Sequence, residues 1–407
     1  MDEWQDRLRV AMFTNVYLPV TNGVVVSVES FRQALTRLGH HAYVMAPACG
    51  EIEDRAPYVF RYPALELPLQ KYPLTLPVSP YVDQVLRNLK PQVLHANHPA
   101  LLGRVAERKS EELDLPLVFT YHTRYADYSH YAHPLPEESV KEFIQTWLGE
   151  FMARCHHLVV PSQSIKNLLL ETYELSGPIS VVPTGVDLEH FAPRDRAEAR
   201  AQLGWPLQPK VFLSVGRLAK EKNFELLLQA FARLQEPGAR LVILGSGDEK
   251  SALEKLAHQL GLRERCQFAG SVAHKDLPTY LAAADVFAFA SLTETQGLAT
   301  LEALAVGLPV AAVDASGTRD IVSPDCSLLT PAEPAALARA MGEMAGRQGM
   351  ASLARAQAAR FGQLEQGRRL VEAYEQAIES HRHQQHVLQL SSESRSRWQT
   401  FLQFFRL

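Results

Sequence analysis

The sequence feature that most constrains the fold is a regular alternation of short apolar runs with helical patterns. The first run is Leu8 to Phe13, and an amphipathic helical pattern follows from about Val24 to Leu38. Further runs are HAYVMAP, QVLHAN, LVFTYHT and HLVVPSQS, each followed by a loop or a helical pattern. Buried strands that alternate with helices predict a parallel sheet covered on both faces.

The alternation pauses once and then restarts, which divides the chain. Residues 183–210 are polar, contain four prolines and are predicted to form a linker. The runs KVFLSVG, RLVILGSG, CQFAG, DVFAFAS and PVAAVD follow, and helical patterns close the chain from Pro334 to about His381. We therefore predict an N-terminal α/β domain at 1–185, a C-terminal α/β domain at 186–365 and C-terminal helices at 366–407.

Composition and charge exclude several classes of protein. The chain has 407 residues, of which 46% are hydrophobic and 21% are charged, as in packed soluble proteins. A net charge of −4 argues against nucleic acid as a partner, because such proteins usually need a basic surface. The four cysteines lie far apart, so we expect neither a disulfide framework nor a zinc site. Unpaired cysteines also fit the reducing conditions of the cytoplasm. We expect no signal peptide, because the N-terminus MDEWQDRLRV is acidic and lacks an apolar core. We expect no membrane span, because no run of about 18 apolar residues exists.

The strongest candidate for a binding site is the segment TETQGLATLEALAVGLPVAA. Glu294 lies in the loop after a predicted strand, and Glu302 lies on a helix that begins near Gly297. The free N–H groups of a helix start bind anions, and carboxylates accept hydrogen bonds from sugar hydroxyls. The pattern predicts a site for a polar, phosphorylated ligand. An acidic helix start with a solvated second glutamate is the alternative.

A second candidate is the segment VGRLAKEKN. Arg217 and Lys222 stand in one loop at the carboxyl end of a predicted strand, and two cations there suit a diphosphate. An ordinary exposed loop is the alternative. The later segment LGSGDE is a weak phosphate-loop signal, because it lacks the full GxGxxG pattern. No two aspartates are separated by one residue, so the sequence does not favour paired-aspartate metal chemistry.

The N-terminal half holds two more candidates. Gly23 lies where a loop becomes a helix, which would allow a ligand to approach the backbone, although taken alone the residue is better explained by a simple helix-starting turn. His122 ends a predicted strand and is expected to face a cleft. Tyr121, Tyr125 and Tyr128 are predicted to form an aromatic wall that faces an acceptor. The histidines nearby lack a carboxylate or cysteine at a usual ligand spacing, so we predict no metal site.

Two segments suit contact with a membrane. Residues 56–80 contain six prolines among apolar and aromatic side chains, which is typical of a loop with its own small core or of an acceptor-facing or membrane-facing loop. The tail from Arg395 to Leu407 interleaves aromatic side chains with arginines, which suits an interface. A last helix packed on the first domain is the alternative for the tail.

Taken in order, these motifs resemble those of retaining glycosyltransferases of family four, which have the GT-B fold. The resemblance covers about residues 9–377 and rests on the Gly23 loop, His122, GRLAKEKN, LGSGDE and the paired glutamates followed by GLPVAA. It implies an α/β chain of two Rossmann-like doubly wound parallel-sheet domains that face a central cleft. It also implies that the C-terminal helices cross back to the N-terminal domain.

The resemblance implies a role for each candidate in catalysis. His122 would contact the transferred sugar near its C6 hydroxyl, and Glu294 would bind hydroxyls of the donor sugar. Arg217 and Lys222 would hold the diphosphate and stabilise its leaving charge.

The resemblance also implies a donor-binding set. Gly23 would lie close to the diphosphate and sugar, and Glu302 would bind the ribose. The base would border Gly270 to Val272. Backbone N–H groups of Gly297 and Leu298 would meet the sugar or diphosphate. The segment ASGTRD departs from the family, which often has a glycine-rich turn and then a glutamate there.

Within the family, the segments TETQGL, YHTRYADYSHY and NGVVVSV are most similar to enzymes that glycosylate diacylglycerol. This implies retaining transfer of a hexose, glucose or galactose, from a UDP-linked nucleotide sugar to 1,2-diacylglycerol. It implies no metal or other cofactor and a peripheral position on the inner face of the cell membrane. Phosphatidylinositol, a polyprenol glycolipid or a soluble sugar are alternative acceptors. A non-transferring epimerase or a sugar-nucleotide-binding regulator are alternative functions.

Overall fold

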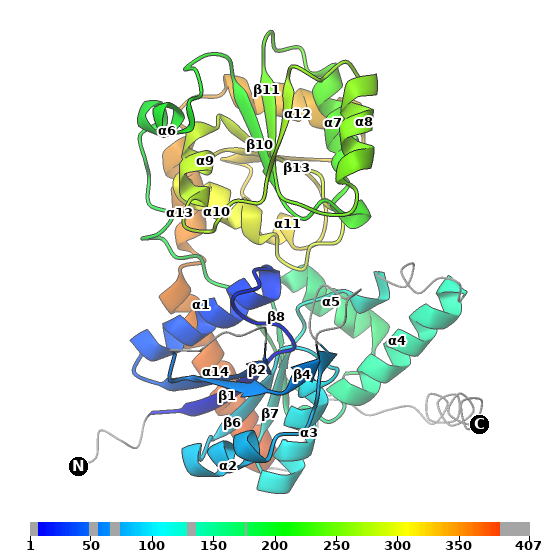
Figure 1. Cartoon of the computed structure of the whole chain (residues 1–407), viewed down its shortest axis with the longest axis vertical. Helices are drawn as coiled ribbons and strands as arrows, with labels where there is room; N and C mark the ends of the chain where they lie inside the picture. The colour runs from blue at the N-terminus through cyan, green and yellow to red at the C-terminus, as the bar shows by residue number, and fades with distance from the viewer. Residues whose placement is uncertain (1–6, 49–55, 66–73, 128–135, 176, 383–407) are drawn as a thin grey trace. The chain divides into compact units, whose positions relative to one another are not determined.

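The computed structural model describes residues 7–48, 56–65, 74–127, 136–175 and 177–382. The chain forms two compact units: unit 1 comprises 1–185 and 364–407, and unit 2 comprises 186–363. The division after Gly185 lies where the sequence predicts a domain boundary, and the last helix belongs with unit 1. Each unit is a parallel sheet between layers of helices (Figure 1).

Unit 1 contains a seven-stranded sheet with the order β3-β2-β1-β6-β7-β8-β9, in which every neighbouring pair is parallel. The chain leaves β1 in one direction and later returns to its other side, which makes the sheet doubly wound. The strands are β1 (Arg9–Phe13), β2 (His41–Pro47), β3 (Val59–Tyr62), β6 (Val93–Ala96), β7 (Leu117–Thr120), β8 (His157–Val160) and β9 (Ile179–Val181).

Alternate residues of the central strand β1 enter two different cores of unit 1. Ala11 and Phe13 pack with α2 (Pro80–Leu89), α3 (Leu102–Leu113), α4 (Glu137–Met152) and α5 (Gln163–Thr172). Val10 and Met12 pack with α1 (Gly23–Arg37) and α14 (Gln363–Arg382). Successive side chains of a strand point to opposite faces of the sheet, and helices cover both faces here. Nearly every residue of the strand is therefore buried, which explains the almost continuous apolar runs.

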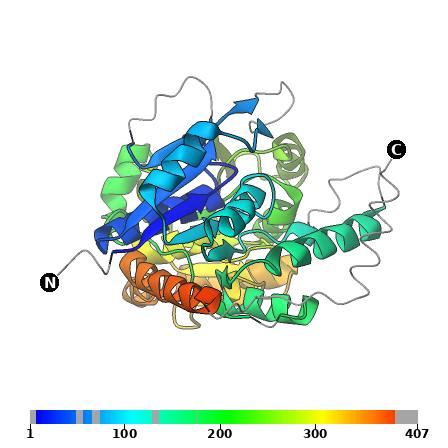
Figure 2. The ribbon, with the colours of Figure 1, turned by 90° about the horizontal axis from the view of Figure 1, so that it is seen from below.

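Helix α14 completes the second of these layers, although it lies far along the chain from the strands it covers (Figure 2). Gly367 allows the close approach of α14 to α1, because a Cβ there would lie 2.7 Å from Cβ of Ala34. Tyr374 is fully buried, and its hydroxyl lies 2.8 Å from Nδ1 of His95 on β6. The tail from residue 383, including Arg395 to Leu407, lies outside the described residues.

The proline-rich stretch after Ala56 forms part of the sheet and a small hairpin. β3 joins the edge of the main sheet, and β4 (Ala64–Leu65) pairs antiparallel with β5 (Leu74–Thr75). Leu65 stands directly opposite Leu74, and these side chains are 50% and 38% exposed. Thr75 alternates to the inner side and is buried. The hairpin therefore presents leucines to solvent.

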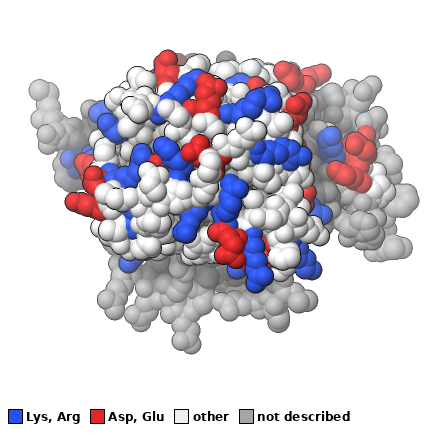
Figure 3. Space-filling model, turned by 90° about the horizontal axis from the view of Figure 1, so that it is seen from above, with Lys and Arg blue, Asp and Glu red and all other residues white. Residues whose placement is uncertain are grey.

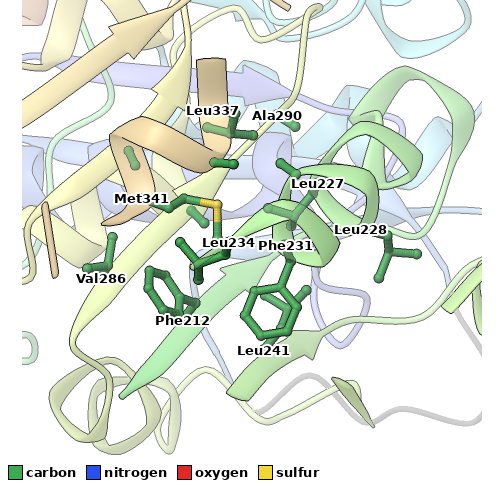
Figure 4. Close-up of a cluster of buried hydrophobic side chains, with 14 of the residues drawn as sticks. Phe212, Leu227, Leu228, Phe231, Leu234, Leu241, Val286, Ala290, Leu337 and Met341 are labelled. Carbon is green, nitrogen blue, oxygen red and sulfur yellow. The ribbon is translucent and has the colours of Figure 1, made fainter. Parts of the chain in front are cut away.

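Unit 2 contains a six-stranded, all-parallel sheet with the order β12-β11-β10-β13-β14-β15. Phe212 of β10 packs on one face with α7, α8 and α12, and Leu213 packs on the other with α6, α9, α10 and α13. Figure 4 shows part of the first core, where Phe212, Phe231 and Met341 meet.

The strands of unit 2 are β10 (Val211–Val215), β11 (Arg240–Leu244), β12 (Cys266–Gly270), β13 (Val286–Phe289), β14 (Val310–Val313) and β15 (Ser327–Thr330). The helices are α6 (Arg196–Leu203), α7 (Phe224–Arg233), α8 (Lys250–Gln259), α9 (Leu277–Ala283), α10 (Leu298–Val306), α11 (Thr318–Ile321), α12 (Pro334–Gly346) and α13 (Met350–Ala359), with the short 3₁₀ helix η2 (Lys220–Lys222).

The prediction of a plain linker at 183–210 is wrong, because α6 forms within it. Asp195 caps the helix by accepting a hydrogen bond of 2.9 Å from the N–H of Glu198. Arg200 is buried and donates to Oδ2 of Asp285 at 2.6 Å. Removal of one partner of such a buried pair costs about 3–5 kcal/mol. The polar composition thus concealed a helix that is anchored by an ion pair rather than by an apolar stripe.

The surface carries charges of both signs. Figure 3 shows Lys and Arg side chains interspersed with Asp and Glu over the face that it draws. Within the part of the chain that the structure describes, no helix has the length and apolar character that a membrane crossing needs.

Candidate active site

The loop after β10 places Arg217 beside a buried carboxylate. Arg217 forms an ion pair with Glu221, whose side chain is only 3% exposed, while that of Arg217 is 52% exposed. The ion pair fixes the guanidinium of Arg217, while much of the Arg217 side chain stays in solvent. Glu221 is a residue that the sequence analysis missed, because a glutamate between two lysines gives no sign of burial.

The glycines of LGSGDE support this loop through close backbone packing. A Cβ at Gly245 would lie 1.9 Å from the carbonyl oxygen of Gly216, and one at Gly247 would lie 2.2 Å from that of Leu218. The N–H of Leu218 also donates to the carbonyl of Ser246 at 2.9 Å. The structure thus gives these glycines a packing function: they hold the Arg217 loop in place.

The loop after β13 brings Glu294 to Lys222. Nζ of Lys222 lies 2.5 Å from Oε1 of Glu294, and the two side chains are 20% and 14% exposed. Gly317 lies directly against this loop, because a Cβ there would be 2.6 Å from the carbonyl oxygen of Glu294 and from the nitrogen of Gln296. The segment ASGTRD therefore places its glycine where only a missing side chain permits the contact.

Helix α10 follows this loop and supplies both a helix start and a second carboxylate. Gly297 is the N-cap residue, with φ of 82°, and has no side chain to cap the N–H groups that follow from Leu298 onward. Glu302, one turn further, is buried. Such a helix start favours an anion, because its backbone dipoles point outward with their positive ends.

A histidine that the sequence analysis missed holds Glu302. Nε2 of His274 lies 3.3 Å from Oε1 of Glu302, and this hydrogen bond raises the pKa of His274 above its ordinary value. His274 follows Gly270 and Val272 in the loop after β12, and the Ser271 hydroxyl in that loop donates to Ser246 at 2.9 Å. The segment predicted to border a base is therefore tied to both the glycine loop and α10.

Unit 2 thus gathers two cations, two carboxylates and a helix start at one edge of its sheet. Their loops follow β10, β12 and β13, and the carboxyl ends of parallel strands share one edge. Cations and helix starts bind phosphate oxygens, and carboxylates bind hydroxyls. Together they suit a ligand with both kinds of group. No group of three or more His, Cys, Asp and Glu side chains among the described residues is placed to hold a metal ion.

Unit 1 carries its candidates at the carboxyl edge of its own sheet. Gly23 is the first residue of α1, and Asn22 before it caps the helix by accepting from the N–H of Val25 at 3.0 Å. His122 follows β7, and its Nε2 lies 2.9 Å from Oδ1 of Asn97, which follows β6. Burial lowers the pKa of His122 well below its ordinary value, so the ring is neutral at neutral pH.

The structure describes two of the three tyrosines that were predicted to form a wall. Tyr121 is 4% exposed and packs in the core against the edge of Phe119, so the prediction that it faces an acceptor is wrong. Its position directly after β7 continues the inward alternation of that strand. Tyr125 is half-buried, with its ring perpendicular to that of Tyr121 at 6.3 Å. Tyr128 lies outside the described residues.

Comparison with known proteins agrees with this arrangement. Residues 21–190 match the family model described as Glycosyltransferase Family 4, and residues 195–358 match that of Glycosyl transferases group 1. An alpha-monoglucosyldiacylglycerol synthase of Acholeplasma laidlawii is 31% identical over 74% of this chain and 79% of its own. The chain belongs to glycosyltransferase family 4.

Other relatives of this glycosyltransferase show how varied the family is. A GDP-mannose-dependent alpha-mannosyltransferase of Mycobacterium tuberculosis is 32% identical over 78% of this chain and 82% of its own. Among solved structures, Anabaena HepE in complex with UDP-glucose superposes with a TM-score of 0.72 at 21% identity, over 91% of this chain and all of that one. The glycosyltransferase therefore has the GT-B fold of two Rossmann-like domains, as the sequence predicts.

Proposed function

We propose that this glycosyltransferase moves a hexose, glucose or galactose, from a UDP-sugar to the hydroxyl of 1,2-diacylglycerol with retention of anomeric configuration. The observation that carries the proposal is the cluster of Arg217, Lys222, Glu294 and the start of α10 at one edge of unit 2. This set of groups suits a sugar diphosphate. The relatives that glucosylate diacylglycerol support the choice of acceptor.

The leaving group of such a reaction is a nucleoside diphosphate, whose charge must be stabilised as the sugar departs. Arg217 and Lys222 supply positive charge, and the N–H groups of Gly297 and Leu298 supply oriented dipoles. Glu294 binds sugar hydroxyls and Glu302 the ribose. With these groups in place, the transfer needs no metal ion. We propose that the acceptor hydroxyl attacks the sugar from the face on which the diphosphate departs. The departing diphosphate takes the proton of that hydroxyl.

We also assign donor-binding roles to Gly23 and His122 in unit 1 and to the segment from Gly270 to Val272 in unit 2, as the family resemblance implies. Gly23 is the first residue of α1, and its missing side chain would let an anion approach the helix start. His122 is neutral and so hydrogen-bonds a sugar hydroxyl without placing a charge beside it. The Gly270 loop borders the base.

A lipid acceptor requires contact with a membrane surface. The hairpin and the start of α2 expose a set of large apolar side chains: Leu65, Leu74, Leu76, Val78 and Tyr81. Val78 and Tyr81 are the most exposed of these, at 68% and 64%. Insertion of these side chains among lipid headgroups would hold the enzyme on the inner face of the cell membrane.

A transfer assay tests the proposal. The purified chain is incubated in detergent micelles with diacylglycerol and, in turn, UDP-glucose, UDP-galactose and GDP-mannose, and the anomeric configuration of the lipid product is read by NMR. We expect an α-glycosyl lipid from a UDP-sugar, formed equally in excess chelator. Transfer only from GDP-mannose, or only to phosphatidylinositol, a polyprenol glycolipid or a free sugar, would contradict the proposed substrates. Epimerised donor without transfer would contradict the reaction.

A further inference from the structure

Asn97 ends the apolar run QVLHAN and was given no functional role by the sequence, yet it contacts His122. It is 2% exposed and lies directly after β6. Its Oδ1 is 2.9 Å from Nε2 of His122, its Nδ2 donates to the carbonyl of Phe13 at 3.3 Å, and its own N–H donates to the same carbonyl at 2.8 Å. The amide thus bridges the ends of β1 and β7.

These contacts fix the orientation of the amide and, through it, the tautomer of His122. The opposite amide orientation would turn Oδ1 toward the Phe13 carbonyl, where two acceptors would face each other. Oδ1 therefore points at the imidazole. Because a carbonyl oxygen only accepts, Nε2 of His122 carries the proton and Nδ1 carries a lone pair.

The surroundings of His122 keep the ring uncharged. Burial lowers its pKa, and the neighbouring His98 and His95 lower it further. Burial also lowers the pKa of His98 to about 4 and that of His95 to about 3, so neither neighbour carries a charge at neutral pH. His122 is thus held as one neutral tautomer.

The backbone around Asn97 leaves it little freedom to move. The N–H of Asn15 donates to Nδ1 of His98 at 3.1 Å, and the Asn15 amide donates to the carbonyl of Ala100 at 3.1 Å. A Cβ at Gly103 would lie 1.8 Å from the carbonyl oxygen of His98, so the first turn of α3 is in close contact with the backbone that follows Asn97. A donor or acceptor held this rigidly is suited to orient a neighbouring group.

We propose that Asn97 is a positioning residue that holds His122 as the neutral Nε2–H tautomer. In this tautomer the Nε2–H is committed to Oδ1 of Asn97, so His122 contacts the sugar as a neutral ring and does not transfer a proton in the reaction. This inference rests on the proposed function, which places His122 at the sugar.

The tautomer is tested first by NMR of the full-length chain with ¹⁵N-labelled histidine, with His122→Gln used to assign the His122 signals. We expect the Nε2–H pattern from pH 6 to pH 8. In Asn97→Leu, which has similar size and no acceptor, the pattern should become a mixture. In Asn97→Asp, which keeps an acceptor, it should persist with a raised His122 pKa. An Nδ1–H pattern in the wild type would overturn the proposal.

A double-mutant cycle tests the effect on transfer. Asn97→Leu should lower kcat about tenfold or more with a smaller change in KM, and should cause no further loss in a His122→Ala background. Asn97→Asp should recover most of kcat near pH 8, and the pH profile should move with the His122 pKa. If Asn97→Leu lowers kcat by the same factor in the wild-type and His122→Ala backgrounds, Asn97 does not act through His122 and has only a structural role.

Two controls separate the possible failures. Thr120→Val removes a buried hydrogen bond to His95 on the adjacent strand and should lower the melting temperature with kcat unchanged. If His122→Ala leaves transfer intact, the proposed role of His122 in the reaction fails, whereas the NMR result still decides whether Asn97 fixes the tautomer.

Discussion

Nζ of Lys222 lies 2.5 Å from Oε1 of Glu294, and 72 residues separate them along the chain. The contact exists because β10 and β13 are neighbours in a parallel sheet, so the loops at their carboxyl ends meet. The proposed function assigns Lys222 to the diphosphate and Glu294 to the sugar, and this contact would place those two groups side by side. In a ligand-free site, each charge also offsets the burial of the other.

Lys222→Ala should reduce transfer strongly. Loss of a preorganised cation at the leaving diphosphate costs about 2–4 kcal/mol of transition-state stabilisation, or roughly 30-fold to 10³-fold in kcat/KM. Steady-state kinetics measures this. Lys220→Ala is the matched control, since Lys220 is exposed on the same short helix and should retain full activity. Wild-type turnover in Lys222→Ala would remove Lys222 from the mechanism.

Gly317→Ala should displace the Glu294 loop. The new Cβ would lie 2.6 Å from backbone atoms of that loop, on a residue with φ of 76°. Gly349→Ala is the control, because Gly349 has nearly the same φ of 74° but no atom within 4 Å of a new Cβ. Gly349→Ala should lose about 1 kcal/mol from its left-handed conformation. Gly317→Ala should lose more, because its ψ of −54° lies outside the left-handed region that other residues can adopt. Only Gly317→Ala should also lose kcat, and equal kinetics in both variants would show that the loop contact is irrelevant to transfer.

The bond between His274 and Glu302 should stabilise unit 2 most in mild acid. The hydrogen bond raises the folded-state pKa of His274 above about 6.5, so its contribution is complete below that pH and is lost as the pH rises through the folded value. The difference in unfolding free energy between the wild type and His274→Gln should therefore shrink between pH 6 and pH 8. A difference that stays constant over this range would show that the pair does not titrate.

The buried histidines of unit 1 should make the protein less stable in acid than at neutral pH. Burial lowers the pKa of His95 to about 3 and those of His98 and His157 to about 4. Their neutral forms favour the folded state above pH 6.5, and stability falls as the pH drops, by about 1.4 kcal/mol per pH unit for each proton that only the unfolded chain binds. Denaturant unfolding at pH 7, 6 and 5 measures this slope, and a flat profile would contradict it.

The exposed apolar side chains near α2 should support vesicle binding. Val78→Ser with Tyr81→Ser should reduce sedimentation with anionic vesicles and transfer to diacylglycerol in them, while hydrolysis of the donor continues. Leu207→Ser with Leu353→Ser removes exposed leucines from unit 2 and serves as the matched control. High salt should release part of the bound enzyme, because each basic residue adds about 1 kcal/mol at most. Equal binding by both double variants would exclude this surface.

A separate deletion decides the function of the tail. Removal of Arg395 to Leu407 should weaken vesicle binding if the tail lies at the interface. If the tail packs on unit 1, the deletion should instead lower the melting temperature and leave binding per folded molecule unchanged.

Much of the fold was predictable from local patterns. The apolar runs became strands of two parallel sheets, and the helix predicted at about Val24 to Leu38 formed as α1. The loops that hold Arg217 and Glu294 were predictable because they follow such runs. Helix α6 was not, since its stability comes from Arg200 and the distant Asp285 rather than from an apolar stripe. The burial of Tyr121 could have been predicted, because it continues the alternation of Leu117 and Phe119 toward the core.

The sequence by itself determined where strands, helix starts and glycine turns occur, because each depends on periodicity or residue type within a few positions. Only the tertiary structure decided which of these sites meet. Asn97 reaches His122 because β6 and β7 are adjacent, and His274 reaches Glu302 because α10 lies beside the loop after β12. Such contacts depend on strand order and register, which are set by packing the whole core and leave no local trace along the chain.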